Sequence, residues 1–178
     1  MKISKENLIK GALIIAVMLL ASLSRYIFAD IPNITPILAM ALFAGAMFKN
    51  NIIAYIIPVG AMIISDYFIG FHETSWVIYI AFAMIAFLGT KTNEKSILSI
   101  GTFSISSALL FFVVTNFAIW TLGAYFPMTL SGLIECYTMA IPFFRNTLLS
   151  TLAFSGILFG LSYLLNASTQ TESMKVKK

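Results

Sequence analysis

The residues best suited to chemistry in this sequence are ionisable side chains inside apolar segments. Asp66 and Arg145 are the clearest cases. A charged group at the centre of a membrane-spanning helix costs about 2.5 to 3.5 kcal/mol, so such residues usually face a bundle interior or a cavity. Because the two side chains have opposite charge and similar predicted depth, we expect an ion pair. The pair would line a pocket, or it would only pin two helices together.

Other polar residues are predicted at the same depth. Asn116 and Trp120 are four residues apart and therefore share one face of a helix. Together these residues predict an outward-facing site for a small solute. The candidate substrate-binding residues are Asp66, Asn116, Trp120, Arg145, His72, Tyr137 and Arg25.

The sequence predicts neither a metal site nor a cofactor. His72 is the only histidine, and Trp76 stands four positions later, where a zinc protease would have its second histidine. Cys136 is the only cysteine, so the chain can form no internal disulfide. No Gly-Lys dipeptide occurs, which excludes a phosphate-binding loop of the Walker type. Any ATP-driven work must therefore come from another chain.

The composition predicts the elements that position these residues. The chain has 178 residues, of which 60% are hydrophobic and only 10% are charged, whereas soluble domains have about 25% charged residues. This composition is typical of an integral membrane protein. Six apolar runs predict six transmembrane helices, at residues 8–28, 34–48, 52–70, 75–89, 96–122 and 143–165.

The lysine residues predict the orientation of these helices. If all six runs span the membrane and the amino terminus is cytoplasmic, all nine lysines fall on the cytoplasmic side. We therefore expect an all-α membrane protein with both termini cytoplasmic, which the resemblance described below places in the bacterial cytoplasmic (inner) membrane. Its single domain covers residues 1–165, and a disordered cytoplasmic tail covers 166–178. The alternative for the first run is a cleaved signal peptide.

Small residues four positions apart predict where helices approach closely. Such pairs are Ala12/Ala16, Ala41/Gly45 and Gly156/Gly160. Small side chains let two helix backbones come together, either within one bundle or against a partner subunit.

Four motifs give the sequence a resemblance to a known group of proteins. They are N-x-T-P at 33–36, S-D-x-x-x-G-F-H at 65–72, T-N-F-x-x-W at 115–120 and Y-F-P-x-T-x-x-G-L-x-x-C-Y-x-x-A-I-P-F-F-R-N at 125–146. With them, residues 33–160 resemble a family of uncharacterised bacterial six-helix integral membrane proteins. That family is similar to the substrate-capture S components of energy-coupling-factor (ECF) vitamin transporters.

The resemblance implies a function in uptake. It implies an S-component-like bundle that binds a vitamin-like solute near the outer face, under lids formed before the second span and between the fifth and sixth. It also implies a transmembrane coupling subunit with two ATPases as partners, docked through small residues of the first helix such as Ala12 and Ala16. This sequence has only a short alanine pattern there.

Three classes of function follow from the sequence. The leading hypothesis is a non-enzymatic uptake protein that captures a small solute. The second is an intramembrane enzyme that uses Asp66, His72, Glu73 or Cys136 on a lipid-linked substrate, although no paired catalytic motif is present. The third is an accessory membrane subunit in which the polar residues only specify packing. None of the three involves nucleic acid.

Overall fold

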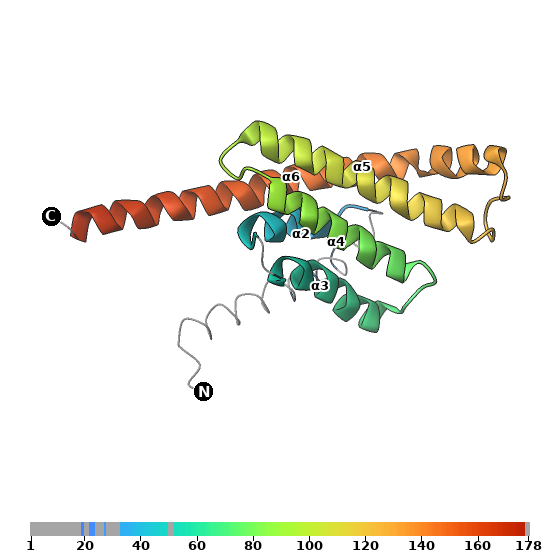
Figure 1. Ribbon diagram of the computed structural model, residues 1–178, viewed down its shortest axis with the longest axis horizontal. Helices are drawn as coiled ribbons and strands as arrows, with labels where there is room; N and C mark the ends of the chain where they lie inside the picture. Colours follow the sequence, from blue (N-terminus) through green and yellow to red (C-terminus); the bar gives the residue numbers. More distant parts are fainter. Residues whose placement is uncertain (1–18, 20–21, 24–26, 28–32, 50–51, 177–178) are drawn as a thin grey trace.

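The described part of the chain is all-helical. The computed structural model describes residues 19, 22–23, 27, 33–49 and 52–176, with side chains to Leu164. These residues form five helices, which are α2 (Ile37–Met47), α3 (Ile53–Ile69), α4 (Ser75–Lys91), α5 (Ile97–Thr121) and α6 (Leu130–Val176) (Figure 1). The prediction of an all-α fold is confirmed. Ala12, Ala16 and Arg25 lie outside the described residues.

Helices α2 to α5 lie close to four of the predicted apolar runs, because polar or flexible residues end each run. The side chain of Ser96 accepts a hydrogen bond from the Ser99 backbone N–H at 3.2 Å and caps the start of α5. Gly70 ends α3 with φ 110°, a conformation that glycine adopts without steric cost.

Helix α6 differs from the prediction at both ends. It begins at Leu130, continues through Pro142 and extends to Val176, so residues 166–176 are helical where a disordered tail was expected. Glu135, which falls between the predicted runs 96–122 and 143–165, lies within this helix. The Thr129 hydroxyl accepts a hydrogen bond from the Gly132 N–H at 3.2 Å and caps the early start. No glycine or proline follows Gly160 to end the helix.

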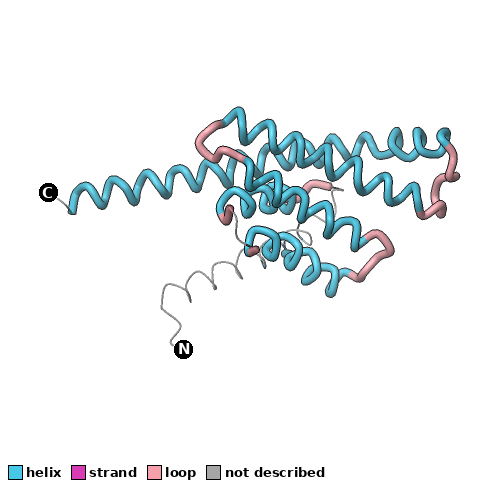
Figure 2. The backbone as a smooth tube through the Cα atoms, in the orientation of Figure 1, coloured by secondary structure: helices cyan, strands magenta, loops and turns pink. Residues whose placement is uncertain are grey.

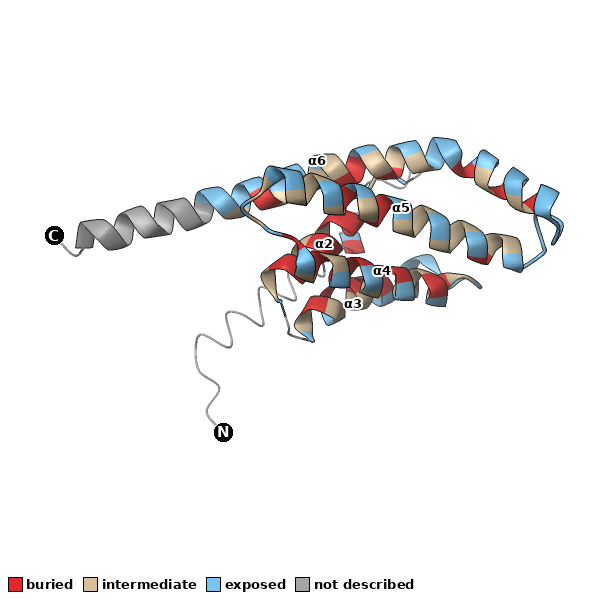
Figure 3. Ribbon diagram, turned by 45° about the horizontal axis from the view of Figure 1, so that its top comes forward, coloured by how far each residue is buried: buried red, intermediate tan, exposed pale blue. Residues whose placement is uncertain are grey.

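The core lies around α2, which contacts the other four helices. Its buried side chains, such as Leu42, pack against Phe82 and Ile85 of α4, and Figure 3 shows buried residues where these helices face one another. At Gly45 and Gly89 the two backbones meet directly. A Cβ atom on Gly45 would overlap the carbonyl oxygen of Ala86, and one on Gly89 would overlap that of Leu42.

The predicted small-residue pairs differ in whether they lie at a close helix crossing. Ala41 and Gly45 are buried at the crossing of α2 and α4, as expected for close helix packing. By contrast, a Cβ atom on Gly156 or Gly160 would meet nothing within 4 Å. These two glycines therefore bring no described helix close to α6.

The connections lie at two opposite ends of the bundle. Figure 2 shows the α2–α3 and α4–α5 connections at one end and the α3–α4 and α5–α6 loops at the other. Lys49, Lys91 and Lys95 lie in or beside the connections at the first end.

Two of the described helices, α5 over Ile97–Thr121 and α6 over Leu130–Leu164, are long and apolar enough to cross a membrane. Helices α2, α3 and α4 are apolar but shorter.

Candidate functional site

A cavity with both polar and apolar walls lies beside the amino-terminal end of α2, between that end and α4, α5 and α6. It consists of two adjoining spaces of about 250 and 280 Å³. Both are lined by Asn33, Ile78, Phe111 and Thr147. The first also has Thr35, Ile37, Leu38, Met62, His72, Phe82 and Ser150, and the second has Thr74, Phe112, Thr115, Asn116, Ile119, Ala140, Phe143 and Phe144.

The segment 33–36 closes the cavity on one side and is fixed at both of its ends. Asn33 has φ 62°, a left-handed conformation that asparagine adopts more readily than most residues. Its carbonyl oxygen accepts a hydrogen bond from the Ser150 hydroxyl of α6 at 3.3 Å. The Thr35 hydroxyl oxygen accepts from the Ile37 N–H, also at 3.3 Å, where α2 begins. The segment is therefore tied to α6 across the cavity.

Hydroxyl and amide groups of α5 and α6 form the polar wall of the cavity. Thr115 donates to the Phe111 carbonyl at 2.7 Å, and Thr147 donates to the Phe143 carbonyl at 3.0 Å. The Asn116 amide donates to the Phe112 carbonyl at 2.8 Å. Such bonds to the preceding turn hold each side chain in one rotamer. The oxygen atoms of these groups can still accept hydrogen bonds.

Aromatic rings complete the lining. The rings of Phe112 and Phe144 have centroids 4.8 Å apart and an interplanar angle of 42°. Phe111 packs edge to face against Phe82 at 5.9 Å. A ligand in this cavity would therefore meet fixed ring surfaces as well as polar oxygens, a combination that is typical of small-molecule sites.

Two predicted site residues line the cavity. Asn116 lines the second space, and His72 lines the first from the α3–α4 loop. The His72 side chain is exposed, and its Nδ1 lies within hydrogen-bond distance of the Ser75 hydroxyl. The Ser75 oxygen also accepts from the His72 backbone N–H at 3.1 Å. These bonds fix the imidazole at the mouth of the cavity.

Two other predicted residues, Trp120 and Tyr137, line neither space. The Trp120 indole N–H donates to the Pro127 carbonyl of the α5–α6 loop at 3.1 Å. The Tyr137 hydroxyl of α6 donates to the Val113 carbonyl of α5 at 2.7 Å. Both side chains therefore hold the α5–α6 hairpin together. Of the segment 123–142, which the resemblance implied as a lid, one residue, Ala140, lines the cavity, and it does so from within α6.

The predicted ion pair between Asp66 and Arg145 is wrong. Asp66 is completely buried on α3, and its carboxylate accepts a hydrogen bond from the Tyr79 hydroxyl of α4 at 2.8 Å. Arg145 is exposed on α6, a helix that does not contact α3. The sequence gives the depth of each residue along the bundle, but it does not give the direction in which each helix faces.

Reasoning from charge also missed the hydroxyl groups of the cavity. Thr147 and Ser150 are three residues apart in α6 and share one face, and Thr115 directly precedes Asn116 in α5. That spacing was the available signal. It was weak because serine and threonine in apolar helices commonly bond only to their own backbone.

Metal binding has no support in the described residues, where no group of three His, Cys, Asp or Glu side chains could hold an ion. Cys136 is buried, and its thiol donates to the Asn116 carbonyl at 3.5 Å. The thiol therefore joins α6 to α5.

Comparison with known proteins gives a family and no function. No curated protein and no solved structure matches the chain. One family model, described as Family of unknown function (DUF6580), matches residues 5–174. Since this match covers nearly the whole sequence, the chain belongs to the DUF6580 family, which fits the uncharacterised family that its motifs resemble.

Proposed function

We propose that the protein is a multi-pass membrane protein that captures a small solute in the cavity beside segment 33–36. The observation that carries this proposal is the polar lining in an otherwise apolar bundle. Three hydroxyl-bearing residues and one amide from α5 and α6 line the two adjoining spaces: Thr147 and Ser150 line the first, and Thr115, Asn116 and Thr147 line the second. Polar groups inside an apolar bundle are costly unless they are bonded, so their convergence on a cavity favours a ligand.

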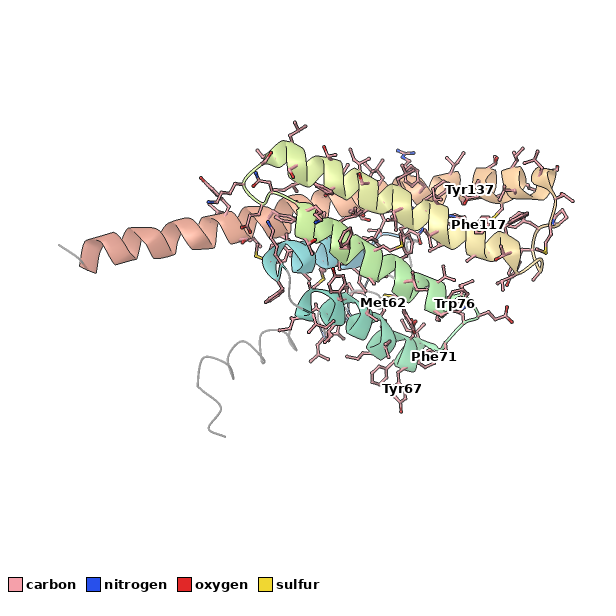
Figure 4. The ribbon with its side chains drawn as sticks, viewed as in Figure 1. Met62, Tyr67, Phe71, Trp76, Phe117 and Tyr137 are labelled. Carbon is pink, nitrogen blue, oxygen red and sulfur yellow. The ribbon has the colours of Figure 1, made fainter. Side chains whose placement is uncertain are left out.

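The outer surface of the bundle supports a lipid environment. Along α5, one side chain in every four forms an apolar stripe that is 44 to 50% exposed, made of Ile105, Leu109, Val113 and Phe117. A helix facing water would have a polar stripe there. Exposed aromatic side chains gather at the α3–α4 end, where Figure 4 shows Tyr67, Phe71 and Trp76. Aromatic residues concentrate in this way at membrane interfaces.

The positions of the lysines support an outward-facing cavity. Lys49, Lys91 and Lys95 lie at one end of the bundle, and lysine-rich ends are cytoplasmic in most membrane proteins. The cavity is lined by His72 and Thr74, which belong to the loop at the opposite end. In this orientation a solute enters from outside. Both termini are then cytoplasmic in a six-span topology.

The resemblance to S components supports a role in uptake. A solute captured near the outer face would be delivered across the bacterial inner membrane, either with a transmembrane coupling subunit and its ATPases or by a solitary protein. The docking residues that the resemblance implies, Ala12 and Ala16, lie outside the described residues. The substrate class remains vitamin-like in this proposal.

Cysteine labelling tests the membrane orientation. In a Cys136→Ser background, a cysteine replaces Asn93 in the α4–α5 connection or Ala124 in the α5–α6 loop. Both residues are exposed. We expect a membrane-impermeant maleimide to label intact cells at position 124 and to label position 93 only after permeabilisation. Equal labelling of both positions in intact cells would overturn the proposed topology.

A cavity-filling variant tests ligand capture. Ile78 lines both spaces, so Ile78→Trp should occupy the volume that a solute needs. The matched control is Ile80→Trp on the same helix, where the side chain is 49% exposed on the outside. Native mass spectrometry of gently extracted protein should show a bound small molecule in the wild type and the control.

The filled variant should lose that molecule while remaining folded. Retention of the same molecule in Ile78→Trp, or a protein that carries none in any form, would contradict the proposed function. A bound lipid product would favour the intramembrane enzyme, and a bound protein chain would favour the accessory subunit.

A further inference from the structure

The hydroxyl groups on the α5 and α6 side of the cavity already donate their protons to backbone carbonyl groups. A serine or threonine hydroxyl has one proton to donate and two lone pairs that accept. Thr115 donates to the Phe111 carbonyl at 2.7 Å, and Thr147 donates to the Phe143 carbonyl at 3.0 Å. Ser150 has the carbonyls of Thr147 and Asn33 within reach, at 3.1 and 3.3 Å. Towards a ligand, these three oxygens are therefore acceptors.

Asn116 adds a further acceptor to this wall. One of its amide N–H groups donates to the Phe112 carbonyl at 2.8 Å, while its side-chain oxygen accepts no hydrogen bond from the described residues. Four acceptor oxygens thus line the α5 and α6 side of the cavity. A ligand group that carries only lone pairs would be repelled there, whereas an N–H or O–H group would find partners.

Groups that could donate lie at the mouth. Asn33 and His72 are exposed, Thr35 and Thr74 are partly exposed like Thr115 and Asn116, and Thr147 and Ser150 are buried. The Thr35 hydroxyl oxygen accepts the Ile37 N–H, which leaves its own proton to donate. Polarity therefore changes across the cavity, from mixed groups on segment 33–36 and the α3–α4 loop to acceptors on α5 and α6, of which Thr147 and Ser150 are the buried ones.

The charges of the lining residues also favour a neutral donor over an anion. The described lining contains no Lys, Arg, Asp or Glu, and His72 at the mouth is its one titratable group. A carboxylate or phosphate placed against α5 and α6 would lose its hydration without gaining a cation, which is costly in an apolar bundle. The neighbouring rings of Phe112 and Phe144 present negative faces, which do not attract an anion.

From these observations we infer that the solute binds with a hydrogen-bond donor group directed towards the acceptor oxygens of α5 and α6. It is a small uncharged molecule whose N–H or O–H group meets an acceptor oxygen of the α5 and α6 wall, such as that of Thr147, which lines both spaces, and whose flat apolar part contacts the phenylalanine rings. Anionic groups are rejected at this end. This inference rests on the proposed function, because it names the chemistry of the solute that the same cavity would capture.

Benzamide and benzoate form a matched pair of probes. They have nearly the same size and shape, but benzamide is neutral and carries an N–H₂ donor, whereas benzoate is an anion that only accepts. A cavity of about 150 Å³ can hold a benzene ring, so either of the two spaces admits them. Each probe is titrated against the full-length protein in detergent, and the rise in thermal stability gives an apparent dissociation constant.

We expect benzamide to bind at least about tenfold more tightly than benzoate, the difference produced by one unpaired polar group. Thr147→Val removes one acceptor without changing the shape of the side chain, and it should weaken the binding of benzamide about fivefold. The control is Thr138→Val. The Thr138 hydroxyl lies on the same helix and donates in the same way to the Ile134 carbonyl at 2.7 Å, but the residue lines neither space. The Thr138→Val variant should therefore leave benzamide binding unchanged.

The outcomes separate this inference from the proposed function. If benzoate binds as tightly as benzamide and Ile78→Trp abolishes both, the inference fails and the cavity remains a binding site. If benzamide produces no stabilisation up to its solubility limit, or if Thr138→Val weakens it as much as Thr147→Val, the inference also fails. If Ile78→Trp leaves benzamide binding intact, the probe binds elsewhere, and both the inference and the proposed site are overturned.

Discussion

Replacing Gly45 with alanine is expected to lower the free energy of unfolding by about 3 kcal/mol, the upper part of the range for overpacked sites. The added methyl group would overlap the Ala86 carbonyl, which belongs to the α4 backbone and cannot rotate away. Helices α2 and α4 would have to separate, and α2 contacts every other described helix. Reversible denaturation in detergent micelles measures the change.

The matched control for this substitution is Gly156→Ala. Gly156 is also a helical glycine in a small-residue pair, but a Cβ atom there would meet nothing within 4 Å. Since alanine is favoured over glycine in helices by about 1 kcal/mol, this variant should be neutral or slightly more stable. Equal destabilisation by both substitutions would contradict the close approach of α2 and α4.

Loss of the hydrogen bond between Tyr79 and Asp66 is expected to destabilise the fold without affecting ligand binding. Tyr79→Phe removes a donor from a completely buried carboxylate, which should cost about 2 kcal/mol. Neither residue lines the cavity, so the probe affinities should not change. Denaturation in micelles and the benzamide titration measure the two effects separately.

A double-mutant cycle identifies the source of this effect. If Tyr79→Phe acts by breaking the bond, it should cost much less in an Asp66→Ala background, which has no acceptor, than in the wild type. Equal costs in both backgrounds would mean that the tyrosine acts through packing alone. If Tyr79→Phe instead had normal stability but did not bind benzamide, Asp66 would have to be counted among the candidate binding residues.

Much of the fold could be predicted from the sequence because apolar runs and polar breaks are local signals. The residues around Gly70 and Lys95 break the chain where helices end in the structure. The last predicted run begins directly after Pro142, but α6 continues through this proline, although proline interrupts most helices. Helix α6 is therefore much longer at its amino-terminal end than its hydropathy indicated.

The site was harder to predict because it depends on which way each helix faces. Asn116 and His72, two of the predicted site residues, line the cavity. Asp66 and Arg145 were predicted at the same depth but lie on helices that do not touch. Thr147 and Ser150 carry no charge, and only the packing of α6 against segment 33–36 makes them part of a site.

The length of α6 has a mechanical consequence. At about 1.5 Å per residue, its 47 residues form a rod roughly 70 Å long, more than twice the roughly 30 Å of a hydrocarbon core. If α6 crosses the membrane as proposed, such a rod must protrude into the aqueous phase even when it is strongly tilted. Thr147 and Ser150 belong to the same helix, so a force applied to its protruding part would be transmitted along the helix and would shift the oxygens that line the cavity.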